Sequence, residues 1–176
     1  MITLVIGGCR SGKSSHALGL ANALSGTRKL FIATSVPTDS EMENRVIKHQ
    51  QERGNSWITA EEPLEIANII DEKSGSSDVI LVDCLTLWTS NLMFNNLDQP
   101  AIELKLQALA SSLGRACCPV ILVSNEVGAG IVPENALARQ FRDLAGFVNQ
   151  RIASVADRVV WMVAGIPVKI KPVTTV

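Results

Sequence analysis

Short apolar runs alternate with longer mixed segments along this chain of 176 residues. Five runs rich in Val, Ile and Leu have the length and composition of buried strands. They lie at 2–6, 30–33, 79–82, 120–123 and 159–163. The segments between them are long enough for helices that cross from one strand to the next. This alternation predicts an α/β fold, a three-layer sandwich with a mostly parallel sheet and helices on both faces.

Helical periodicity is clearest in three of the intervening segments. Between Ala101 and Arg115 one apolar stripe recurs at helical spacing, and Asp98 with Pro100 marks its start. The stripe consists of Ile102, Leu106, Leu109 and Leu113. Further helices are predicted at 14–24 and 137–156.

The last apolar segment has a different character. In 161–171, Gly165 and Pro167 separate two short runs and leave no room for a helix between them. This pattern predicts an antiparallel hairpin at an edge of the sheet.

Composition narrows the class of protein. A hydrophobic fraction of 47% and the absence of internal repeats are typical of one domain, expected to span 1–176. With 16 basic and 17 acidic side chains, the chain has no electrostatic footprint for nucleic acid. No apolar stretch is long enough for a membrane span, so we expect a soluble, cytoplasmic protein. The four cysteines show no metal-ligand spacing, and we expect reduced thiols.

Eight residues after the first strand match the phosphate-binding loop G-x-x-x-x-G-K-[ST]. They are Gly7, Gly8, Cys9, Arg10, Ser11, Gly12, Lys13 and Ser14. In such a loop, backbone N–H groups turn toward a phosphate, the lysine places a positive charge on the β and γ oxygens, and the hydroxyl of Ser14 reaches Mg²⁺. The loop lies between a strand and a helix, as the motif requires, and predicts nucleoside triphosphate binding.

Asp83 follows the apolar run 79–82 directly. An acid at the end of such a strand holds Mg²⁺, directly or through water, in proteins with this loop. The alternative is that Asp83 caps the helix that follows.

His49 lies on a predicted helix in 39–54, one turn from both Arg45 and Arg53. Two guanidinium groups beside an imidazole suit a phosphate, and a neutral imidazole can attack phosphorus and form a covalent intermediate. A solvated surface histidine is the simpler interpretation of spacing alone. His16, in the helix behind the loop, is expected to be structural.

Polar residues and glycines also follow the run 120–123, from Ser124 to Gly130, where open α/β sheets bind ligands. Further on, Arg139 and Arg142 are three residues apart. They could form an anion site, a subunit contact or a solvated salt-bridge surface, and the pattern does not choose among these.

Taken together, these segments resemble one family over essentially the whole chain. It is the bifunctional adenosylcobinamide kinase / adenosylcobinamide-phosphate guanylyltransferase family, with a P-loop NTPase fold of the RecA-like type. The phosphate loop is generic, whereas the run Asn125 to Asn135 is far more specific. The resemblance implies that ATP or GTP phosphorylates adenosylcobinamide. GTP then donates GMP through a covalent guanylyl-histidine to give adenosylcobinamide-GDP.

The resemblance also implies residue roles. His49 matches the guanylylated histidine, and Lys13 would act with it in catalysis. Beyond the loop 7–14, nucleotide-binding positions would be Ala33, Thr34, Ser35, Gln50, Gln51, Glu52, Arg53, Glu61 and Asp83, with Ser14 and Asp83 holding Mg²⁺. Family members often carry His-His where this chain has Lys48 and His49, and some have Glu in place of Asp83. The second difference shortens the acid by one methylene.

The oligomeric state and two other functions also have to be considered. The family implies a homotrimer. The stretch 87–94 holds more apolar residues than a solvent-exposed segment usually does, which is consistent with a subunit contact. The alternative is a helix that faces the core. A simple small-molecule kinase would use the same loop without a covalent nucleotide. A non-catalytic RecA-like switch module would bring polynucleotide-binding loops or a basic surface, and neither is visible.

Overall fold

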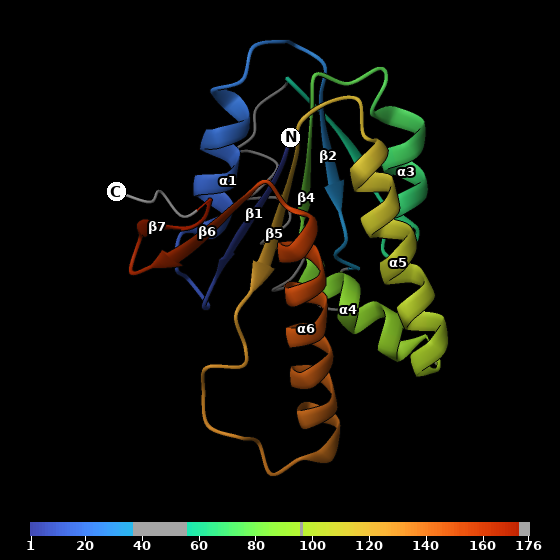
Figure 1. Cartoon of the computed structure of the whole chain (residues 1–176), viewed down its shortest axis with the longest axis vertical. Coiled ribbons are helices and arrows are strands. Elements are labelled where there is room, and N and C mark those ends of the chain that lie inside the picture. Colours follow the sequence, from blue (N-terminus) through green and yellow to red (C-terminus); the bar gives the residue numbers. More distant parts are fainter. Residues whose placement is uncertain (37–55, 96, 173–176) are drawn as a thin grey trace.

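The computed structural model describes residues 1–36, 56–95 and 97–172 (Figure 1). The strands are β1 (Ile2–Gly7), β2 (Lys29–Ala33), β3 (Trp57–Glu61), β4 (Val79–Asp83), β5 (Val120–Asn125), β6 (Arg158–Val163) and β7 (Ile166–Lys171). The helices are α1 (Lys13–Asn22), α3 (Ile66–Lys73), α4 (Leu85–Phe94), α5 (Gln99–Arg115) and α6 (Ala136–Val155).

All seven strands form one sheet in the order β3-β2-β4-β5-β1-β6-β7. Every neighbouring pair is parallel except β6 and β7, which form the predicted antiparallel hairpin at the edge. The prediction of a mostly parallel sheet is therefore confirmed. Strand β5 lies between β1 and β4, so that three strands far apart in sequence are neighbours in space.

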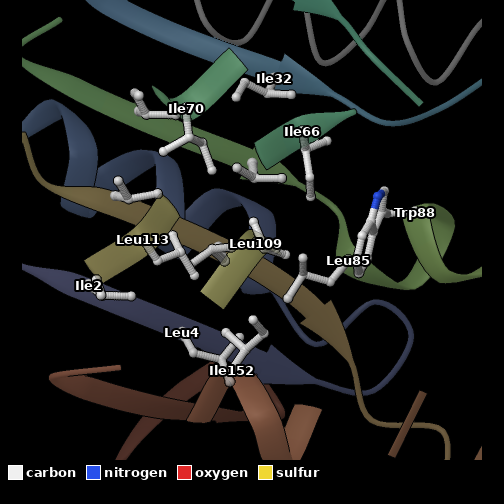
Figure 2. Close-up of a cluster of buried hydrophobic side chains, with 14 of the residues drawn as sticks. Ile2, Leu4, Ile32, Ile66, Ile70, Leu85, Trp88, Leu109, Leu113 and Ile152 are labelled. Carbon is white, nitrogen blue, oxygen red and sulfur yellow. The ribbon is translucent and has the colours of Figure 1, made fainter. Parts of the chain in front are cut away.

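Two hydrophobic clusters hold the helices against opposite faces of the sheet. One cluster joins the sheet to α3, α4, α5 and α6, and Figure 2 shows part of it, including Leu109, Leu113 and Ile152. The other cluster joins the sheet to α1 through Ala17 and Ala21. Figure 1 accordingly shows α1 on one side of the strands and α3 and α5 on the other. The three-layer arrangement confirms the expectation of helices on both faces.

Both long helices begin at a residue whose side chain caps them, and the cap of α5 is the one that the sequence predicts. Asp98 caps α5 by accepting a hydrogen bond from the Ala101 N–H at 3.0 Å, and Asn135 caps α6 in the same way through Ala138. The predicted apolar stripe of α5 is buried along its whole length. The sheet therefore receives a continuous apolar surface from this helix.

Three elements are not among those predicted by name. Strand β3 and helix α3 are short, and α4 is apolar on most sides, so its sequence alone does not distinguish a helix in the core from a surface that binds a partner. Within α4, however, Trp88 and Leu92 are 1% and 0% exposed, whereas Phe94 is 71% exposed. Most of α4 therefore packs on the core, so the alternative of a helix that faces the core describes this stretch, and the expectation of a surface segment does not. No helix in the described ranges is long and apolar enough to cross a membrane.

Candidate functional site

The carboxyl ends of the parallel strands bring the predicted site residues to one edge of the sheet. Gly7 pairs with Asn125, Asp83 pairs with Val123 and with Ala33, and Ala33 pairs with Glu61. Residues from five separate strands thus meet along one line. This edge is where open α/β sheets bind ligands.

Alternation along the strands also places these residues on one face. In β4 and β5, Leu81 and Val123 belong to the cluster under α1, so Asp83 and Asn125, two positions further on, lie on the α1 face. Val5 belongs to the same cluster, which puts Gly7 there as well. The acid of β4 and the end of β5 therefore share the face from which the phosphate loop enters α1.

The loop 7–14 has the backbone geometry that its glycines predict. Gly12 has φ +86° and precedes the first residue of α1, and Arg10 also adopts a positive φ of 54°. The helix therefore begins at Lys13, with its N-terminal N–H groups at the loop, an arrangement that binds phosphate. The Lys13 ammonium donates to the Gly8 carbonyl at 3.1 Å. Its charge is held over the loop.

The hairpin β6–β7 supports the loop from the side. The Gly165 N–H, at the hairpin turn, donates to the Ser11 carbonyl at 3.2 Å. A Cβ atom on Gly12 would lie 3.6 Å from the Gly165 Cα, so the two backbones are in close contact. The sequence predicts this hairpin from Gly165 and Pro167 but gives no signal that its turn reaches the phosphate loop.

Asp83 ends β4, so the N-cap position of the following helix falls on the next residue. The N-cap of α4 is Cys84, which makes no side-chain cap. The half-buried carboxylate of Asp83 and the hydroxyl of Ser14 are both hard oxygen donors at this edge, which is the donor chemistry that Mg²⁺ prefers. Two protein oxygens also fit an ion that takes its remaining ligands from phosphates and water. In the described residues no group of three or more His, Cys, Asp and Glu gathers into a metal cluster.

Thr34 has a structural task at this edge. Its side chain is 0% exposed, and its hydroxyl donates to the Cys84 carbonyl and accepts from the Cys84 N–H, both at 2.8 Å. Asn91 then donates to the Thr34 carbonyl at 2.8 Å. The hydroxyl of Thr34 therefore joins the ends of β2 and β4, while the adjacent Ser35 is half-buried.

The remaining predicted site residues do not gather at one point. Glu61 ends β3 and is exposed. His16 lies half-buried on α1, one turn after Gly12, and lines a cavity of about 370 Å³ between this helix and the hairpin. Arg45, His49 and the range 50–53 lie outside the described residues.

The arginines of α6 organise the loop between β5 and α6. Arg139 donates to the carbonyls of Pro133 and Glu134, and Arg142 donates to the carbonyl of Gly128. Glu126 accepts from the N–H groups of Gly128 and Ala129 at 2.6 and 3.1 Å. Both guanidinium groups thus bind loop carbonyls, a use that was not among the alternatives that the spacing left open.

The four cysteines are free thiols. Burial raises the pKa of Cys84, next to Asp83, to about 11, so this thiol is protonated and uncharged at neutral pH. Cys9, in the phosphate loop, is exposed.

Comparison with protein families gives one match over nearly the whole chain. Residues 3–170 match the model of a family described as cobinamide kinase / cobinamide phosphate guanyltransferase. The bifunctional adenosylcobalamin biosynthesis protein CobU of Escherichia coli K12 is 44% identical over 183 aligned residues, covering 97% of this chain and 100% of that protein. CobP of Pseudomonas aeruginosa, also named a bifunctional adenosylcobalamin biosynthesis protein, is 42% identical, covering 97% and 98%.

Solved structures of lower identity share the fold. The RadB recombinase aligns with a TM-score of 0.55 at 16% identity, over 91% of this chain and 73% of that one. A second solved structure, described as an ATPase domain, aligns with a TM-score of 0.51 at 13% identity, over 91% and 68%. These matches confirm the P-loop NTPase fold.

Proposed function

Because the chain belongs to the cobinamide kinase / cobinamide phosphate guanyltransferase family, we propose that it catalyses both reactions of that family's name. It phosphorylates the aminopropanol hydroxyl of adenosylcobinamide with ATP or GTP, and it then joins GMP from GTP to the product. The supporting observation is the convergence of the phosphate loop and Asp83 on one face of the sheet edge, in a chain that matches the family over residues 3–170. We further propose that it does so in the cytoplasm.

In the kinase step, the hydroxyl oxygen of the corrinoid forms a bond to the γ-phosphorus while the bond from that phosphorus to the β-γ bridging oxygen breaks. The hydroxyl proton passes to solvent, and the nucleoside diphosphate leaves. Backbone N–H groups of the loop 7–14 and the charge of Lys13 stabilise the phosphate oxygens. Ser14 and Asp83 would hold Mg²⁺, which offsets phosphate charge when bound.

In the guanylyl step, a ring nitrogen of His49 forms a bond to the α-phosphorus of GTP, and the bond to the bridging oxygen of pyrophosphate breaks. A phosphate oxygen of adenosylcobinamide phosphate then attacks the same phosphorus and displaces His49. The product carries a diphosphate between the corrinoid and guanosine. Arg45 and Arg53, one helical turn away in sequence, would stabilise the phosphates of the intermediate.

A homotrimer is part of the same proposal. Exposed apolar side chains on the hairpin, with Trp161 at 42% and Ile166 at 65% exposure, offer surface that another copy could cover. Sedimentation equilibrium at micromolar concentration should give three times the chain mass of 18.9 kDa. A monomer mass would contradict the trimer and would leave the two proposed reactions unaffected.

The decisive experiment labels the protein with GTP carrying ³²P at the α-phosphate. The parent should retain label after denaturation, and the label should be lost in acid and kept in alkali, because protonation turns the imidazole into a good leaving group. His49→Ala should abolish labelling and guanylyl transfer and leave phosphorylation of adenosylcobinamide largely intact.

His16→Ala is the matched control, since it removes the other histidine of the chain and should leave labelling unchanged. Full guanylyl transfer by the His49 variant would contradict the covalent step. A parent that phosphorylates the corrinoid and never takes up label would be a simple kinase.

A further inference from the structure

Two buried side-chain atoms in the described part of the chain lack a hydrogen-bond partner, Ser11 Oγ and Asn125 Oδ1. Both lie beside Gly7. Asn125 is the strand partner of Gly7, and a Cβ atom on Gly7 would stand 2.5 Å from Ser11 Oγ. Buried polar atoms are nearly always satisfied in native proteins, so a pair of exceptions at the entrance of a phosphate loop indicates atoms that a ligand completes.

The backbone of Asn125 is fixed from the opposite face of the sheet. Its N–H donates to Thr86 Oγ1 at 2.6 Å, and its carbonyl accepts from Asn149 Nδ2 at 3.1 Å. Asn149 in turn accepts from Ser124 Oγ at 2.6 Å. Buried side chains from α4, β5 and α6 thus hold the end of this strand, and such support fixes the position of the residue that it carries.

The side chain of Asn125 lies on the other face, with Asp83 and the phosphate loop. Strand order places it between them, since β5 separates β4 from β1. A carboxamide carries an acceptor at one end and donors at the other, and half a turn about its last side-chain bond exchanges the two ends. The buried position that now holds an unpaired acceptor can therefore present an N–H₂ group to a phosphate oxygen.

We infer that the side-chain amide of Asn125 contacts the terminal phosphate of a nucleoside triphosphate bound in the loop 7–14. An amide does not titrate, so Asn125 orients this phosphate for transfer and neither adds nor removes a proton. The inference rests on the proposed nucleotide binding, and it adds a ligand contact from β5 to those predicted from β1 and β4.

The test compares two nucleotides that differ by that phosphate. We would measure the dissociation constants of GDP and of a non-hydrolysable GTP analogue for the parent, Asn125→Ala and Asn125→Asp. Asn125→Ala should weaken the analogue roughly tenfold and leave GDP within about threefold of the parent. It should also slow phosphorylation of adenosylcobinamide by roughly 10²-fold.

Asn125→Asp separates a phosphate contact from a packing role. Aspartate has nearly the shape of asparagine, so a packing role would make it the milder change. A phosphate contact makes it the harsher one for the analogue, because the carboxylate repels phosphate. The control is Val123→Ala, a buried position on the same strand and face, which should lower the melting temperature and keep the parent's ratio of analogue to GDP affinity.

Equal loss of GDP and analogue affinity in both variants, or an aspartate variant milder than alanine, would overturn the inference. A parent that binds neither nucleotide would instead contradict the proposed function. The first failure appears in the Asn125 variants and the second in the parent, so the experiment distinguishes them.

Discussion

At the amino ends of the strands, carboxylates meet backbone N–H groups, whereas at the carboxyl ends a hydroxyl and an amide oxygen are buried without partners. Asp78 accepts from the N–H groups of Thr27 and Arg28 and so joins β4 to β2. Asp157 accepts from the Ile2 N–H at 2.6 Å and joins β6 to β1. The amino edge is complete in itself, and the carboxyl edge is built to be completed by a ligand. Substitutions at the two edges should therefore affect different properties.

The largest effect is expected at the carboxyl edge. Lys13→Ala should slow both phosphorylation and guanylyl transfer by roughly 10²-fold or more, because each reaction stabilises phosphate charge at this loop. Its melting temperature without nucleotide should stay close to that of the parent, since within the described part of the chain the hydrogen bond of the lysine ammonium goes to the nearby Gly8 carbonyl. Steady-state rates and thermal unfolding check the two halves of this prediction. A variant with parental rates would show that the loop does not hold the reacting phosphates.

Gly26 should give the opposite result at the amino edge. It has φ +115°, and a Cβ atom there would stand 2.5 Å from the side chain of Asp78. Gly26→Ala should cost roughly 1–3 kcal/mol of unfolding free energy, because the backbone conformation is strained for alanine and the neighbouring carboxylate must move. Denaturant titration measures that cost, and nucleotide affinity at about 25 °C should be unchanged. Lost affinity in a folded Gly26→Ala protein would mean that the two edges are coupled.

A smaller, pH-dependent effect is expected at Asp78. Hydrogen bonds from Arg28 hold the pKa of this carboxyl at about 2, below its ordinary value of 3.8. A lowered pKa in the folded state contributes stability above about pH 4, and this contribution is lost as the pH falls toward about 2. Asp78→Asn removes the titration. The parent should therefore lose more stability than the variant between these pH values, as thermal unfolding in a pH series would show. Parallel curves of stability against pH for the parent and the variant would argue against the lowered pKa of Asp78.

The sequence predicts a helix whose apolar stripe is long and one-sided, and strands whose short runs are apolar throughout. The stripe of α5 and the buried strands required no knowledge of their neighbours. The environment of helix α4 is harder to predict, because a segment that is apolar on most sides has the same pattern whether it faces solvent or the core. Only the structure shows that the Trp88 side chain is buried and donates to the Leu64 carbonyl at 2.9 Å.

For the site, local motifs predicted the loop 7–14 and Asp83, because each follows a strand directly. The roles of Arg139 and Arg142 were not predictable, since spacing cannot reveal that a cation binds carbonyls of its own chain. That Thr34 lines the nucleotide stays a prediction, and the bonding of its hydroxyl to Cys84 could not be predicted from sequence. Contacts across the sheet depend on register, which a single sequence does not encode in any one segment. The role of His49 stays a prediction.

The central position of β5 also sets the order in which this protein can mature on the ribosome. A chain synthesised through Arg115 already contains the phosphate loop and Asp83, but not the strand that separates and aligns them. Closing β1 onto β4 through β5 spans most of the sequence, and such long-range closure is slow. Nucleotide can stabilise only a chain in which this closure has occurred. We therefore expect the nascent protein to acquire nucleotide affinity late, after Asn125 has emerged.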